Sequence, residues 1–119
     1  MDRARPPDDI TPHDFFTCWI CEAVAVDAER RRRLGDTVAT IIFDLGGDGG
    51  GVYSLRISEG LIVGTPGPLL PSNLRVRVDV ETWRLLNRGA LSAPEAFLRR
   101  RVRLEGDFLL GLKLHLILG

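Results

Sequence analysis

The sequence predicts an α+β domain in which helices cover one face of a five-stranded, mainly antiparallel sheet. Three observations lead to this class. Residues 14–24 carry the apolar spacing of an amphipathic helix, residues 37–80 contain four alternating strand patterns, and a Leu-rich segment follows Gly106 and Asp107. The expected order is a helix, four strands in a meander, two short helices, a fifth strand and a terminal helix.

The first helix is expected to begin at Asp14, a favourable N-cap. Its apolar residues recur with the spacing of a single buried face. They are Phe15, Phe16, Trp19, Ile20, Ala23 and Val24. The polar, proline-rich residues 1–12 ahead of this helix are predicted to form a flexible arm, followed by one domain over residues 13–119.

A short second helix is predicted over residues 27–34, capped by Asp27 and stopped by Gly35. The arginines at positions 30–33 fall in its last turn, where cations favour the negative end of the helix dipole. This run is therefore predicted to be a solvated helix end.

Four strands are expected next, because apolar and polar residues alternate in each. Gly and Pro clusters separate the strands, as is typical of turns. The expected ranges are 37–45, 52–58, 61–64 and 74–80.

Two short helices should follow these strands. One covers residues 81–87 and ends near Gly89, and the other is capped by Ser92. Alternation around Val102 and Leu104 then predicts the fifth strand.

The last segment is ambiguous when only its periodicity is considered. Leucines at positions 110, 112, 114 and 116 alternate with other residues, as in a strand, yet nine of the eleven residues 108–118 are apolar or Gly. Asp107 is a good N-cap and the composition favours a helix. Such a helix would be apolar on nearly all sides, so its surface needs more cover than one core provides.

Composition excludes several classes of protein. The 119 residues are 45% apolar and 27% charged, with a net charge of zero, so the chain has little long-range attraction for nucleic acid or an anionic membrane. No apolar run reaches the ~20 residues of a membrane span. The N-terminus lacks the apolar region of a signal peptide, and the cytoplasm is the expected location.

The residues also argue against catalysis. Cys18 and Cys21 have redox or metal spacing, but no second pair follows and the pair lies within an apolar helical run. The glycine run at 46–51 leads into a strand instead of a helix, so it is predicted to be a hairpin loop and not a phosphate cradle. His13 and His115 have no ligand pattern around them. We expect no enzyme activity, no metal and no cofactor.

The residues that close the chain resemble the closing signature of the sterol carrier protein-2 family. This likeness rests on Ala96-Phe97, on residues 102–107 and on residues 110–114, with supporting matches at 42–45, 53–57 and 73–76. It covers roughly residues 14–118. The chain differs at Arg100, where many members have Gly, and at Asn73, where Asp is common. The pair Arg100-Arg101 is also similar to a bacterial branch linked to ubiquinone biosynthesis.

The resemblance implies a tunnel beneath the helices that holds a fatty acyl chain, a sterol-like lipid or an isoprenoid quinone. Moving about sixteen methylenes from water into such a tunnel gains roughly 12 kcal/mol gross, at about 0.8 per CH₂, before ordering costs. By analogy the lining comes from the inner strand faces and the terminal helix. The expected lining residues are Phe43, Leu55, Val76, Val78, Trp83, Phe97, Phe108, Leu112 and Leu116.

Two hypotheses remain open at this point. The first is a non-catalytic lipid-binding or lipid-transfer protein that contacts membranes transiently. The second is a structural or accessory module of the same fold, with a filled core and a role in homodimerisation. On the terminal helix, Leu110, Leu114 and Leu118 are expected to pack on the protein, whereas Phe108, Leu112 and Leu116 form a neighbouring stripe toward the ligand.

Overall fold

The computed structural model describes residues 5–118, and it describes side chains as far as residue 115. The predicted α+β class is confirmed. The helices are α1 (Pro12–Asp14), the π-helical turn η1 (Phe15–Trp19), α2 (Ile20–Val26), α3 (Ala28–Leu34), α4 (Val80–Asn87), α5 (Ala93–Leu98) and α6 (Phe108–Leu118). The strands are β1 (Ala39–Gly46), β2 (Gly51–Ser58), β3 (Leu61–Pro66), β4 (Leu74–Asp79) and β5 (Val102–Gly106).

The strand order corrects the predicted four-strand meander. The sheet runs β3-β2-β1-β4-β5, and β4 pairs with β1 in parallel, whereas the other three pairings are antiparallel. Only β1 to β3 form a meander. The alternation in β4 defines which of its faces is buried, but it carries no information about which open edge of the sheet the strand joins.

Residues 67–73 make the connection that places β4 beside β1, and they cross the sheet face that points away from the helices. Ser54 holds this segment, since its hydroxyl donates to Gly67 O at 2.7 Å and accepts from Leu69 N at 2.8 Å. Thr40 O accepts from Asn73 N at 2.8 Å. The crossing explains why Ser54, Thr40 and Ile42 are buried on what would otherwise be the solvent face.

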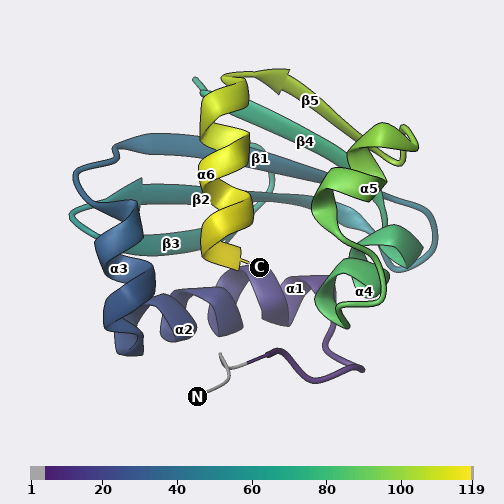
Figure 1. Cartoon of the computed structure of the whole chain (residues 1–119), viewed down its shortest axis with the longest axis horizontal. Coiled ribbons are helices and arrows are strands. Elements are labelled where there is room, and N and C mark those ends of the chain that lie inside the picture. The colour runs from purple at the N-terminus through teal and green to yellow at the C-terminus, as the bar shows by residue number, and fades with distance from the viewer. Residues whose placement is uncertain (1–4, 119) are drawn as a thin grey trace.

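The helices lie on the other face, which we call the inner face (Figure 1). There α6 crosses the strands in front of the sheet, with α3 on one side of it and α4 and α5 on the other. The helical stretch from α1 to α2 runs along the β3 edge. None of the described helices has the length and apolarity needed to traverse a bilayer.

The first helix begins earlier than predicted, because Thr11 instead of Asp14 is the N-cap and accepts from Asp14 N at 3.1 Å. The π-helical turn η1 then brings Phe15 and Phe16 against the sheet. Gly64 permits this approach, because a Cβ there would lie 1.7 Å from Phe16 O. The predicted buried face is otherwise confirmed, with Trp19 half-buried.

The predicted flexible arm begins with residues 1–4, which lie outside the described residues. Further along, Asp8 O and Ile10 O accept hydrogen bonds from the Arg84 guanidinium at 3.1 and 3.0 Å. This part of the chain therefore contacts α4. The division into an arm and one domain stays a prediction.

The arginine run on α3 is only partly the solvated helix end that was predicted. Arg32 and Arg33 are exposed, but Arg30 is 2% exposed. Its guanidinium lies 5.6 Å from the centre of the Trp19 ring and its Nε lies 3.7 Å from Asp27 Oδ2. An aromatic face and a carboxylate together compensate the removal of this cation from water.

Candidate functional site

The turn between β5 and α6 sets the position of the terminal helix. Gly106 has φ +115°, and a Cβ there would lie 2.4 Å from Asn73 O, so this position requires glycine. Asp107 donates its backbone N–H to the same Asn73 oxygen at 2.9 Å. Its carboxylate accepts from Leu110 N at 3.2 Å, which confirms the predicted N-cap. The N-terminal end of α6 is therefore fixed to the start of β4.

The exposure of the α6 side chains divides the helix into two stripes. Leu110 and Leu114 are buried, as expected from the sequence. In contrast, Phe108 is 59% exposed, Leu109 79% and Leu112 59%. The side chains of Leu116 and Leu118 lie outside the described residues. The helix thus exposes one stripe of large apolar side chains to solvent while the other stripe packs on the sheet.

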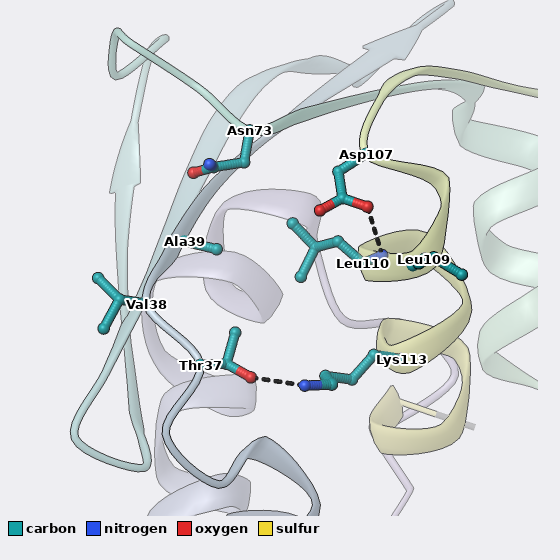
Figure 2. Close-up of a pocket in the computed structure, with 8 residues that line it drawn as sticks. All are labelled: Thr37, Val38, Ala39, Asn73, Asp107, Leu109, Leu110 and Lys113. Carbon is teal, nitrogen blue, oxygen red and sulfur yellow. Dashed lines mark hydrogen bonds between the residues drawn. The ribbon is translucent and has the colours of Figure 1, made fainter.

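A half-open hollow of about 200 Å³ lies where α6 meets the beginning of β1. Figure 2 shows Leu110 pointing into it, with Asp107 and Asn73 on one side and the contact between Lys113 and Thr37 on the other. The Lys113 ammonium donates to Thr37 Oγ1 at 2.8 Å. This polar contact ties the middle of α6 to the segment that precedes β1, and nothing in the spacing of the sequence pointed to it.

An aromatic cluster fills the inner face beneath the helices. The Phe16 ring lies 4.8 Å from the Phe43 ring and 5.2 Å from the Tyr53 ring, measured between ring centres. Phe15 meets Trp83 edge-on at 5.4 Å. The apolar spacing of the first helix indicated that these rings would be buried, but it did not show that they would occupy the space over the sheet.

The structure brings most of the predicted lining residues together on the inner face. Phe43 is opposite Val76, and Leu45 is opposite Val78, in the parallel register of β1 and β4. Five of the nine are buried in the core, namely Phe43, Leu55, Val76, Val78 and Trp83. Phe97, Phe108 and Leu112 are instead exposed on α5 and α6. Each position suits an apolar contact, and a ligand-binding role for these residues stays a prediction.

The expected tunnel is not visible among residues 5–118 as an enclosed cavity. Two hollows, of about 200 and 320 Å³, are both open to solvent. Binding pockets for drug-sized ligands usually measure about 300–1,000 Å³. The aromatic cluster and the two buried leucines of α6 occupy the volume between helices and sheet, so a long ligand needs movement of these groups.

The cysteine pair has the wrong electrostatics for a reactive thiolate. The neighbouring carboxylate of Glu22 raises the pKa of Cys18, and burial raises the pKa of Cys21. Both thiols are free. Within the described chain no three His, Cys, Asp or Glu side chains gather in a way that would hold a metal ion.

The fold and its site together define a small α+β domain whose apolar terminal helix lies across the inner face of a mixed sheet. The family model for the SCP-2 sterol transfer family matches residues 20–119. The chain belongs to this family. No curated protein matches the sequence significantly.

Solved structures share the fold at low sequence identity. The sec-alkylsulfatase Pisa1 from Pseudomonas sp. matches with a TM-score of 0.67 and 23% identity, over 92% of this chain and 16% of that chain. Palmitated SCP2L2 from Aedes aegypti matches with a TM-score of 0.63 and 19% identity, over 83% of this chain and 90% of that chain. The UbiJ-SCP2 ubiquinone synthesis protein matches with a TM-score of 0.61 and 12% identity, over 80% of this chain and 82% of that chain.

The coverage limits what these likenesses mean. This chain spans about one sixth of the sulfatase, so the two share one domain. An identity of 12% to the ubiquinone synthesis protein shows the fold alone, and the resemblance to that branch stays a prediction.

Proposed function

We propose that the chain is a non-catalytic carrier that binds a ligand with a long apolar tail between α6 and the inner face of the sheet. The observation that carries the proposal is the makeup of α6. Nine of its eleven residues are apolar or Gly, and three large apolar side chains, Phe108, Leu109 and Leu112, remain exposed on it. Membership of a sterol transfer family supports the same role.

The energetics favour a tail over a compact ligand. Burial gains about 0.8 kcal/mol per methylene, so affinity rises with tail length and depends little on the rest of the ligand. The palmitated relative makes a fatty acyl chain the first probe to use. The proposed role needs no catalytic group, metal or cofactor, and a cytoplasmic location remains a prediction.

Entry of the ligand is proposed to involve displacement of α6 away from its anchored end. The Gly106–Asp107 turn holds the beginning of the helix, whereas Leu110, Leu114 and the bond between Lys113 and Thr37 hold its middle. Moving the middle outward would open the inner face. The tail would then contact the predicted lining residues that are buried on the inner face, namely Phe43, Leu55, Val76, Val78 and Trp83. Contacts of the tail with Phe97, Phe108, Leu112 and Leu116 stay predictions, because the first three side chains are exposed to solvent.

A second candidate function is a dimerisation or accessory module. The packed aromatic cluster favours it, because a filled inner face leaves the exposed stripe of α6 to be covered by another protein surface. In this alternative Leu112 contacts a second copy of the chain instead of a lipid.

Native mass spectrometry of the purified protein, combined with titration of a fluorescent fatty acid, tests both candidates. Leu112→Arg should weaken fatty-acid uptake at least tenfold, whereas the control Val26→Arg, at an apolar position 82% exposed on α2, should leave it unchanged. Absence of any hydrophobic ligand and of fatty-acid binding would refute the carrier. A dimer in sedimentation that Leu112→Arg dissociates would then support the module.

A further inference from the structure

Four arginines surround an open hollow of about 320 Å³ at the end of β1 and β4, and we call it the arginine hollow. Arg77 and Arg103 are directly opposite each other on β4 and β5. Their neighbours Val76 and Val78 are buried on the inner face, so these two arginines lie on the outer face, away from the helices. The lining residues are Asp44, Gly46, Arg77, Val78, Asp79, Arg100, Arg101 and Arg103.

The lining carries more positive than negative charge, since it has four arginines and two aspartates. Both aspartates already have partners. Asp44 Oδ2 lies 3.4 Å from the Arg75 guanidinium. Asp79 caps α4, accepting from Thr82 N at 3.0 Å and from the Thr82 hydroxyl at 2.6 Å.

Three of the four arginines have donors to spare. Arg77 Nε lies 3.4 Å from Glu105 Oε1. Among the described side chains, Arg100, Arg101 and Arg103 make no salt bridge within 4 Å and no hydrogen bond, although the charge of Arg101 acts on the Asp79 carboxylate. Each guanidinium presents a planar fork of N–H groups that fits two oxygens of one anion.

Two features of the arginine hollow destabilise the fold. Like charges directly opposite each other on neighbouring strands are destabilising, as at Arg77 and Arg103. Arg100 has φ +60°, a backbone conformation that glycine adopts without strain and arginine does not. An anion in the hollow would reduce the repulsion between Arg77 and Arg103. It would also accept hydrogen bonds from Arg100, whose strained backbone places it in the lining of the hollow.

We propose that the arginine hollow binds a phosphate group carried on a small molecule or on a lipid headgroup. A dianionic phosphate matches the surplus of two positive charges, and its tetrahedral oxygens can accept from several guanidinium groups at once. Arg77 and Arg103 lie on the outer face, whereas the proposed tail site lies under α6 on the inner face, and Val78 belongs to both linings. The two proposals rest on different ligand groups, a phosphate and an apolar tail, and are tested separately.

The test uses calorimetric titration with inorganic phosphate and glycerol 3-phosphate, and sedimentation with phosphatidylcholine vesicles with and without phosphatidic acid. Arg103→Gln should weaken binding about tenfold, the usual effect of losing one charged hydrogen bond. Arg32→Gln, the same charge change on α3, should have no effect. Binding of the soluble phosphates would identify a small-molecule source, and binding of only the phosphatidic acid vesicles would identify a headgroup.

Arg100→Gly provides a second variant that cannot fail simply by unfolding. Removing the strained side chain should raise the midpoint of thermal unfolding while it weakens phosphate binding. If Arg100 had only a structural role, its replacement would not raise the unfolding midpoint and lower the phosphate affinity together. Binding of no phosphate in any form, or an equal loss in Arg103→Gln and Arg32→Gln, would overturn the proposal. Loss of fatty-acid uptake would bear only on the tail site.

Discussion

Replacing Gly106 by alanine should destabilise the turn that holds α6 by more than the cost of a positive φ alone. A side chain in this region of backbone space costs about 1–3 kcal/mol. In addition, the new Cβ would lie 2.4 Å from Asn73 O, about an ångström inside ordinary contact distance, and the three nearest atoms all belong to the backbone of Asn73 and Leu74, which cannot rotate away as a side chain could. We expect Gly106→Ala to lower the free energy of unfolding by about 3 kcal/mol or more, a large part of the 5–15 kcal/mol typical of a domain.

Urea denaturation followed by tryptophan fluorescence measures this loss, because Trp83 is buried in the core. Gly47→Ala is the matched control. Gly47 also has a positive φ, of +90°, but a Cβ there meets nothing within 4 Å. The control should lose about 1 kcal/mol. Equal losses in the two variants would refute the argument that the approach to Asn73 demands glycine.

Two further changes test other parts of the fold. Asp79→Ala should cost about 1 kcal/mol at pH 7 by removing a helix cap. Partial burial pushes the pKa of Asp79 upward, but hydrogen bonds from Thr82 and the charge of Arg101 outweigh it and hold the pKa below its ordinary value. The difference in the free energy of unfolding between the wild type and Asp79→Ala should therefore have its full size above about pH 4. It should vanish as the pH falls through the lowered pKa, and a difference that stays constant with pH would contradict this. Ser54→Ala should cost about 1 kcal/mol, because it removes the two hydrogen bonds that the buried Ser54 hydroxyl makes to Gly67 O and Leu69 N. Ser58→Ala should stay within about 0.5 kcal/mol. Similar losses in the two variants would argue against a structural role for the crossing.

The elements of the fold could largely be predicted, because each depends on local chemistry. Alternation located the strands, and cap residues such as Asp27, Ser92 and Asp107 located the helix starts. The terminal segment, with strand-like alternation, is a helix because its cap and composition prevail over its period. Sheet order depended on where residues 67–73 cross, which no local pattern encodes.

The site was less accessible to sequence reasoning. Apolar residues that line a ligand cavity and apolar residues that fill a core obey the same periodicity, so Phe43 and Trp83 fitted both interpretations. What decides between them is whether neighbouring rings occupy the space, and Phe15 and Phe16 reach it only through a π-helical turn and a close approach at Gly64. Neither feature has a recognisable signature in the chain.

Asn73 joins parts of the molecule that lie on opposite faces of the sheet. Its side-chain oxygen accepts from Thr40 N at 2.8 Å, and its backbone oxygen accepts from Asp107 N at 2.9 Å. One residue thus ends the segment that crosses the outer face, closes onto the central strand and anchors the root of α6. The start of α6 and the segment that covers the outer face therefore share one anchoring residue, Asn73, although they lie on opposite faces of the sheet.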